Sequence, residues 1–118
     1  MTLILLATVA LLAGSLSTAA QTAPAQTPAG DAEAGKKLYT SYGCYQCHGF
    51  EGQGSSATGP RLGPRPLPVA VFTRYVRRPT GQMPPYGTRI ASDADLANIH
   101  AYLASRPAPV QNIPLLQK

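Results

Sequence analysis

One pentapeptide, CYQCH at residues 44–48, constrains this chain more than any other stretch. Cys44 and Cys47 stand three positions apart, and His48 follows directly. One helical turn can carry both sulfurs to the two vinyl edges of a haem and point the next imidazole at the ring centre. This order of residues is typical of a c-type haem attachment site, in which each thiol forms a thioether and the histidine binds the iron. The pentapeptide therefore predicts one haem c, attached through two thioethers.

Three other interpretations of the two cysteines remain open. A thioredoxin-like redox pair would need a surrounding strand–helix–strand pattern, which the sequence does not show. A structural zinc site needs four ligands, and Cys44, Cys47, His48 and His100 are the only cysteine and histidine candidates. A simple disulfide is the third alternative. A red colour that stays with the denatured polypeptide would distinguish the haem interpretation from all three alternatives.

The composition divides the chain into four parts. Residues 1–20 resemble a secretion signal, with an apolar run followed by small residues, although no Lys or Arg precedes the run. An uncleaved signal anchor is the alternative. Residues 21–30 predict a flexible linker, residues 31–106 a single folded domain, and residues 107–118 a C-terminal tail. A signal fits the pentapeptide, because thioether attachment in c-type cytochromes takes place outside the cytoplasm, and it predicts a periplasmic or otherwise exported protein.

Three segments carry helical signals, and no strand pattern is long enough to build a sheet. The predicted helices span residues 32–42, 69–78 and 93–105. Asp31 and Ser92 are suitable N-caps for the first and the last of them. The fold class is therefore predicted to be all-α.

Apolar periodicity assigns the faces of these helices. The side chains expected to face inward are Leu38, Tyr39, Phe72, Tyr75, Val76, Leu96, Ile99, Tyr102 and Leu103. Those expected on the opposite side of the second helix are Arg74, Arg77 and Arg78. Gly35 costs about 1 kcal/mol relative to alanine within a helix. It predicts the close approach of another helix, unless it is merely tolerated near the helix start.

A haem iron held by His48 has a second axial position. Met83 is the only methionine besides the initiator, and it lies in a loop stiffened by Pro84 and Pro85. His100 is the only other histidine and falls within the last predicted helix. Met83 is the predicted sixth ligand, with His100 or an open position as the alternatives. A thioether ligand favours ferrous iron, and two protein ligands suit electron transfer better than substrate chemistry.

With these residues placed, the chain resembles a class I (mono-haem) cytochrome c from about residue 31 to 105. Besides the pentapeptide, the similar segments are Gly35–Tyr39, Gly59–Leu62, Met83–Tyr86 and Ile99–Leu103. The resemblance implies a small helical fold wrapped around one covalently bound haem. It also implies that the carbonyl of Pro60 accepts a hydrogen bond from His48 Nδ1 and orients the ring, and that the last-helix aromatic packs across Gly35.

The function implied is an exported electron carrier rather than an enzyme, moving single electrons between redox proteins. The alternatives are a haem subunit permanently bound to a dehydrogenase or oxidase, or a five-coordinate haem that binds a small ligand. The net charge of +5 fits a redox partner with an acidic docking surface, or serves solubility alone. We expect no nucleic-acid partner, and membrane attachment only if the signal stays uncleaved.

Overall fold

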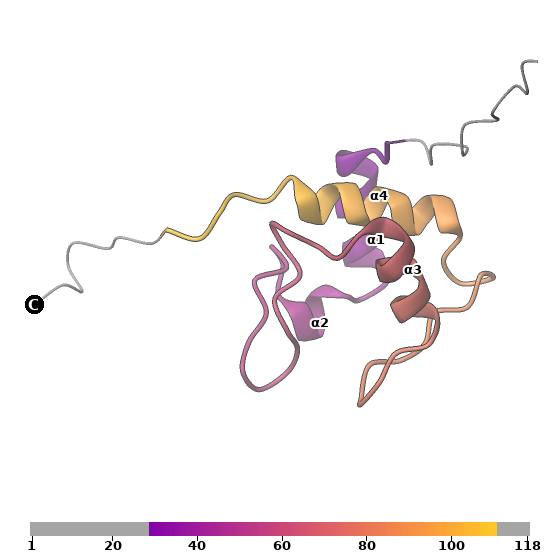
Figure 1. Cartoon of the computed structure of the whole chain (residues 1–118), viewed down its shortest axis with the longest axis horizontal. Helices are drawn as coiled ribbons and strands as arrows, with labels where there is room; N and C mark the ends of the chain where they lie inside the picture. The colour runs from indigo at the N-terminus through magenta and orange to yellow at the C-terminus, as the bar shows by residue number, and fades with distance from the viewer. Residues whose placement is uncertain (1–28, 111–118) are drawn as a thin grey trace, which may run out of the picture.

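The computed structural model describes residues 29–110 of the 118-residue chain. This part contains four helices: α1 Ala32–Ser41, α2 Tyr45–His48, α3 Val69–Arg77 and α4 Asp93–Ala104 (Figure 1). It contains no β-strand, only an isolated bridge between Ser55 and Gly59. The predicted all-α class is therefore confirmed. The predicted signal sequence, most of the linker and the end of the tail lie outside the described residues.

The three longer helices begin where the sequence predicts and end one residue earlier. The last predicted residues, Tyr42, Arg78 and Ser105, serve as C-caps instead. The predicted N-caps are also observed. Asp31 accepts hydrogen bonds from the backbone N–H groups of the first turn of α1, and Ser92 forms a reciprocal capping box with Asp95. Helix ends depend on neighbouring residues in the chain, so sequence alone could locate them.

The crossing of α1 and α4 is the centre of the fold (Figure 1). A Cβ atom added to Gly35 would meet the backbone carbonyl of Asn98, so only glycine permits this approach. The predicted close helix contact is therefore confirmed. The residue opposite Gly35 is Asn98, however, and not Tyr102. Tyr102 packs one turn further along, with its ring centroid 5.4 Å from that of Tyr39.

Tyr39 and Tyr102 connect the helical core to the chain that follows α2. Both rings are almost fully buried. The Tyr39 hydroxyl donates to the carbonyl of Gly49 at 2.8 Å, and the Tyr102 hydroxyl donates to that of Phe50 at 2.6 Å. Burial raises the pKa of both phenols, which therefore remain hydrogen-bond donors at neutral pH. The core thus fixes the two residues directly after His48.

The prediction for α3 was partly wrong. Phe72 and Val76 are buried as expected, but Tyr75 is 42 % exposed. Its hydroxyl lies 2.7 Å from Thr80 Oγ1, so its polar tip bonds to the next loop and the ring stays at the surface. Arg77, expected in solvent, is mostly buried and bonds to two backbone carbonyls. Periodicity gives the direction of a side chain, whereas the partners that its tip finds are set by the tertiary fold.

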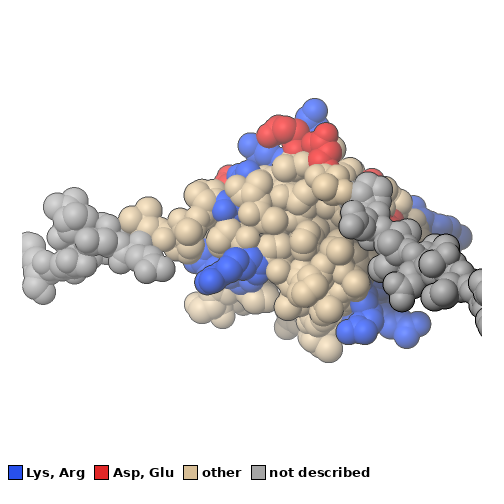
Figure 2. All heavy atoms as spheres, turned by 45° about the horizontal axis from the view of Figure 1, so that its top comes forward, with Lys and Arg blue, Asp and Glu red and all other residues tan. Residues whose placement is uncertain are grey.

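Charged side chains stand in separate groups on the face shown in Figure 2, around a broad uncharged area. Of the helices in the described part of the chain, none has the length and apolar character needed to cross a membrane.

Candidate functional site

The pentapeptide forms one tight helical turn. Cys44 is the N-cap of α2, and the backbone N–H of His48 donates to the Cys44 carbonyl at 3.1 Å. Both cysteines are free thiols. Cys47 is exposed, whereas Cys44 is half-buried against the core. Burial raises the pKa of the Cys44 thiol to about 11. One thiol therefore faces the interior and the other lies at the surface, one turn apart.

His48 is buried, and one of its ring nitrogens has a defined partner. His48 Nδ1 lies 2.9 Å from the carbonyl oxygen of Pro60. Because a carbonyl can only accept, Nδ1 carries the proton, and Nε2 of the neutral ring keeps a free lone pair. A Cβ atom at Gly59 would lie 3.0 Å from His48 Nδ1 and Cε1. The missing side chain lets this loop lie directly against the imidazole.

The loop after α2 folds back onto the pentapeptide. The backbone N–H of Gly54 donates to the His48 carbonyl at 2.8 Å, and the Thr58 hydroxyl donates to the Cys47 carbonyl at 2.7 Å. Gly52 and Gly54 have φ angles of +65° and +68°, which favour glycine. These bonds satisfy the free carbonyls at the end of α2 and carry Pro60 to the imidazole.

Met83 lies in the loop between α3 and α4. It is half-buried and packs on the hydrophobic cluster that Cys44 also contacts. Three residues later, the Tyr86 hydroxyl donates to the carbonyl of Tyr42 at 2.8 Å. Burial raises the pKa of Tyr86, and negative charge on Cys44 and Cys47 would raise it further. The structure therefore brings Tyr86, at the returning end of the Met83 loop, to the C-cap of α1.

A comparison with protein families decides what kind of domain this is. The family model described as cytochrome c oxidase, cbb3-type, subunit III, matches residues 30–103. The chain belongs to this family. It is a c-type cytochrome domain of electron transfer, in agreement with the class I resemblance of the sequence. No curated protein matches the chain.

The donor atoms of this cytochrome fit the haem c that its family implies. Two free thiols stand one turn apart, the buried imidazole keeps Nε2 free, and the Met83 thioether packs on the core cluster that Cys44 also contacts. The thiols of Cys44 and Cys47 would form the thioether bonds. The His48 imidazole and the Met83 sulfur would serve as ligands of the iron.

His100, the alternative ligand of the sequence analysis, lies elsewhere in the cytochrome. Its Nε2 is 2.8 Å from the Leu67 carbonyl, and its ring packs in a T-shaped arrangement with that of Phe72, with the ring centroids 5.6 Å apart. It therefore joins α4 to the start of α3. Within residues 29–110, no three His, Cys, Asp or Glu side chains gather as a metal site would require. The family match favours haem over the zinc interpretation.

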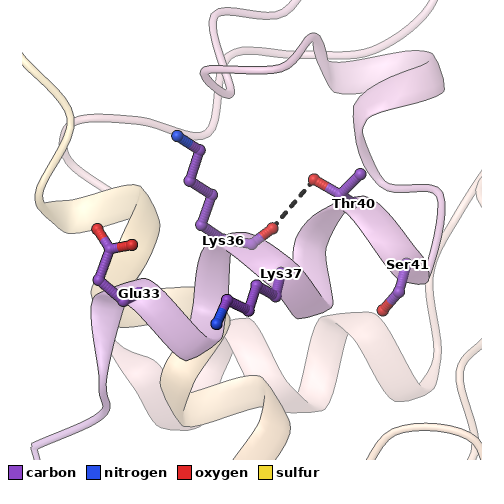
Figure 3. A pocket seen from close by; sticks show the side chains of 5 residues that line it. All are labelled: Glu33, Lys36, Lys37, Thr40 and Ser41. Atoms are coloured by element: carbon purple, nitrogen blue, oxygen red, sulfur yellow. Dashed lines mark hydrogen bonds between the residues drawn. The ribbon is translucent and has the colours of Figure 1, made fainter.

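A surface pocket of the cytochrome lies apart from these groups. All its lining residues belong to α1 and are Glu33, Lys36, Lys37, Thr40 and Ser41 (Figure 3). The Thr40 hydroxyl donates to the Lys36 carbonyl within the same helix at 3.0 Å. None of the predicted site residues lines this pocket, and it has no part in the candidate site.

Sequence reasoning missed two residues around the Met83 loop. Tyr86 entered as part of the Met83 motif, but its bond to the carbonyl of Tyr42 was not predicted. Arg77 was assigned to the solvent side of α3. An arginine at the last turn of a helix, directly before a proline-rich loop, is the signal that could have identified it.

Proposed function

We propose that this protein is an exported mono-haem cytochrome that carries single electrons between larger redox proteins. The observation that carries the proposal is the bond between His48 Nδ1 and Pro60. It leaves Nε2 available as an iron ligand, in a ring that directly follows the two thiols.

Each predicted site residue has a role in this proposal. Cys44 and Cys47 would hold haem c through thioethers, His48 and Met83 would bind its iron, and Pro60 orients His48. The bound haem supplies one-electron chemistry. The carbonyl of Pro60 makes His48 a stronger donor, and the soft sulfur of Met83 favours ferrous iron and raises the reduction potential. If His48 and Met83 both bound the iron, no position would remain for a substrate, which would suit a carrier rather than an enzyme.

Location and partners follow from the same chemistry. Cytochrome c domains are usually exported, and residues 1–20 supply the predicted signal for the periplasm or another exported location. We propose residues 31–106 as the electron-transfer domain, after a linker at 21–30 and before a tail at 107–118. The net charge of +5 favours partners with an acidic docking surface.

A haem subunit held permanently in a larger complex is the second candidate. The description of the matching family, a subunit of an oxidase, favours it. The two candidates share the haem chemistry and differ in assembly. A free carrier would purify as a monomer under mild conditions, whereas a subunit would copurify with a large catalytic protein.

The optical spectrum of the purified protein in both redox states tests the proposal. We expect a c-type haem that stays with the denatured chain and a sulfur-to-iron charge-transfer band in the oxidised state. Met83→Ala should abolish this band, lower the reduction potential and open the ferrous iron to carbon monoxide. His100→Ala is the matched control and should leave all three unchanged. Rapid carbon monoxide binding by the unaltered protein would instead support a five-coordinate ligand-binding haem.

A further inference from the structure

Arg77 joins three parts of the fold at the base of the Met83 loop. Its Nη1 donates to the carbonyls of Tyr86 and Ala91, each at 2.7 Å, and its Nη2 lies 2.5 Å from Asp93 Oδ1. The Arg77 side chain is only 16 % exposed. A planar guanidinium can serve several acceptors at once in a fixed geometry, which a lysine ammonium cannot reproduce. Arg77 therefore links the end of α3, the returning loop and the start of α4.

The loop that Arg77 closes has few other attachments. The chain leaves α3, doubles back and returns to it (Figure 1), where the Tyr86 N–H donates to the Val76 carbonyl at 3.1 Å. Among the described residues, none forms a backbone–backbone hydrogen bond with residues 79–85. Pro79, Pro84 and Pro85 have no N–H to donate. Thr80 is bonded to the Tyr75 hydroxyl and Met83 packs on the core cluster, whereas the returning end of the loop is held by the bonds of Tyr86.

We propose that Arg77 is a positioning residue that holds the Met83 loop in the arrangement needed for axial ligation. The inference rests on the proposed ligation by Met83. Arg77 does not touch the ligand itself; it fixes the carbonyl of Tyr86, whose hydroxyl is bonded to Tyr42 beside the pentapeptide. Without the guanidinium, Tyr86 keeps the bonds of its N–H to Val76 and of its hydroxyl to Tyr42. Its carbonyl loses the bond to Arg77, and the loop loses its connections to Ala91 and Asp93. Met83 should then leave the iron more often, while the helices remain folded.

The test compares Arg77→Gln with Arg77→Lys and the control Arg106→Gln in the haem-loaded protein. Arg106 is a matched control because it is 20 % exposed and pairs with Glu51 at 2.6 Å, yet it makes no bond to this loop. The sulfur-to-iron band and the helical signal are followed together on heating. The rate of carbon monoxide binding to the ferrous protein is also measured.

For Arg77→Gln we expect the band to disappear at a lower temperature than the helical signal, and carbon monoxide to bind about tenfold faster. Arg77→Lys should show smaller changes in both the temperature at which the band disappears and the rate of carbon monoxide binding. If Arg77→Gln does not accumulate in the cell, Arg77→Lys is the variant to be measured. In Arg106→Gln the band and the helices should be lost together, with carbon monoxide binding as in the unaltered protein.

A second substitution separates positioning from general loosening. In a Met83→Ala background, Arg77→Gln should leave the carbon monoxide rate unchanged, because no ligand remains to be positioned. An equal acceleration in both backgrounds, or a band that persists until the helices melt, would overturn the role of Arg77. If the unaltered protein lacks the band and binds carbon monoxide as fast as Met83→Ala, the proposed ligation itself fails.

Discussion

Gly59 decides how closely the loop can approach His48. An added Cβ atom would lie 3.0 Å from two atoms of the imidazole and 3.1 Å from the Cys47 carbonyl. Gly59 has no left-handed backbone angle, so its requirement for glycine is steric. The adjacent Pro60 makes the bond to His48 Nδ1, and a displaced Gly59 would carry that carbonyl away from the ring.

We expect Gly59→Ala to lower the free energy of unfolding of the haem-loaded protein by about 1–3 kcal/mol, the usual cost of overpacking. Denaturant unfolding gives the measurement. Gly87→Ala is the control, because an added Cβ there would meet nothing within 4 Å. Equal stability of the two variants would show that the loop can move without loss, and that contact with Gly59 does not fix the imidazole.

The sequence predicted the contacts of some residues and not of others, and the reasons are physical. The resemblance implied the bond between Pro60 and His48, and the structure contains it. Gly35 indicated a helix crossing because a glycine inside a helix needs a reason, but its partner Asn98 lies on a different helix and left no local signal. The prediction for Arg77 was wrong for the same reason, because its acceptors on Tyr86 and Ala91 are brought near only by folding.

Among the helices of the described residues, α4 has the most complete N-terminal capping. Asp95 Oδ2 accepts from the Ser92 N–H at 2.8 Å and from the Tyr42 hydroxyl at 3.0 Å, so the capping box also joins α4 to the end of α1. These bonds, first of all the backbone bond from Ser92, lower the pKa of Asp95 below its ordinary value. A carboxyl with a lowered pKa stabilises the fold above its ordinary pKa and loses that contribution as pH falls through the lowered value.

We therefore expect Asp95→Asn to reduce the free energy of unfolding by about 1 kcal/mol near neutral pH. The difference from the unaltered protein should begin to shrink below about pH 4, the ordinary range of an aspartate carboxyl, and should be lost as pH falls through the lowered pKa of Asp95. Denaturant unfolding at a series of pH values measures this difference. Glu33→Gln, in the first turn of α1, is the control and should show a smaller effect. A difference that stays constant or grows in acid would contradict the assignment.

At the scale of the whole molecule, the hydrophobic core is small. Within residues 29–110, only nine apolar side chains are buried, and two of them are alanines. Helix α4 packs on α1 and α3, whereas the short α2 is held chiefly by hydrogen bonds from the loop after it and by its place between α1 and that loop. A domain of this size buries only a modest part of its surface. The large apolar face of a haem would therefore supply a substantial share of the missing core, and its attachment would be part of folding.

Removal of the haem tests this dependence. We expect Cys44→Ala/Cys47→Ala, produced through the same export route, to lose most of its far-ultraviolet helical signal and its cooperative unfolding, because cofactor binding energy contributes to folding energy. The single variant Cys47→Ala is the control: it keeps the half-buried Cys44 for one thioether and should remain helical and coloured. The α1–α4 crossing, with its glycine contact and paired tyrosines, is the part most able to persist without haem. A colourless double variant with full helicity and a sharp unfolding transition would show that the polypeptide core suffices, and that the haem is carried by a fold already complete.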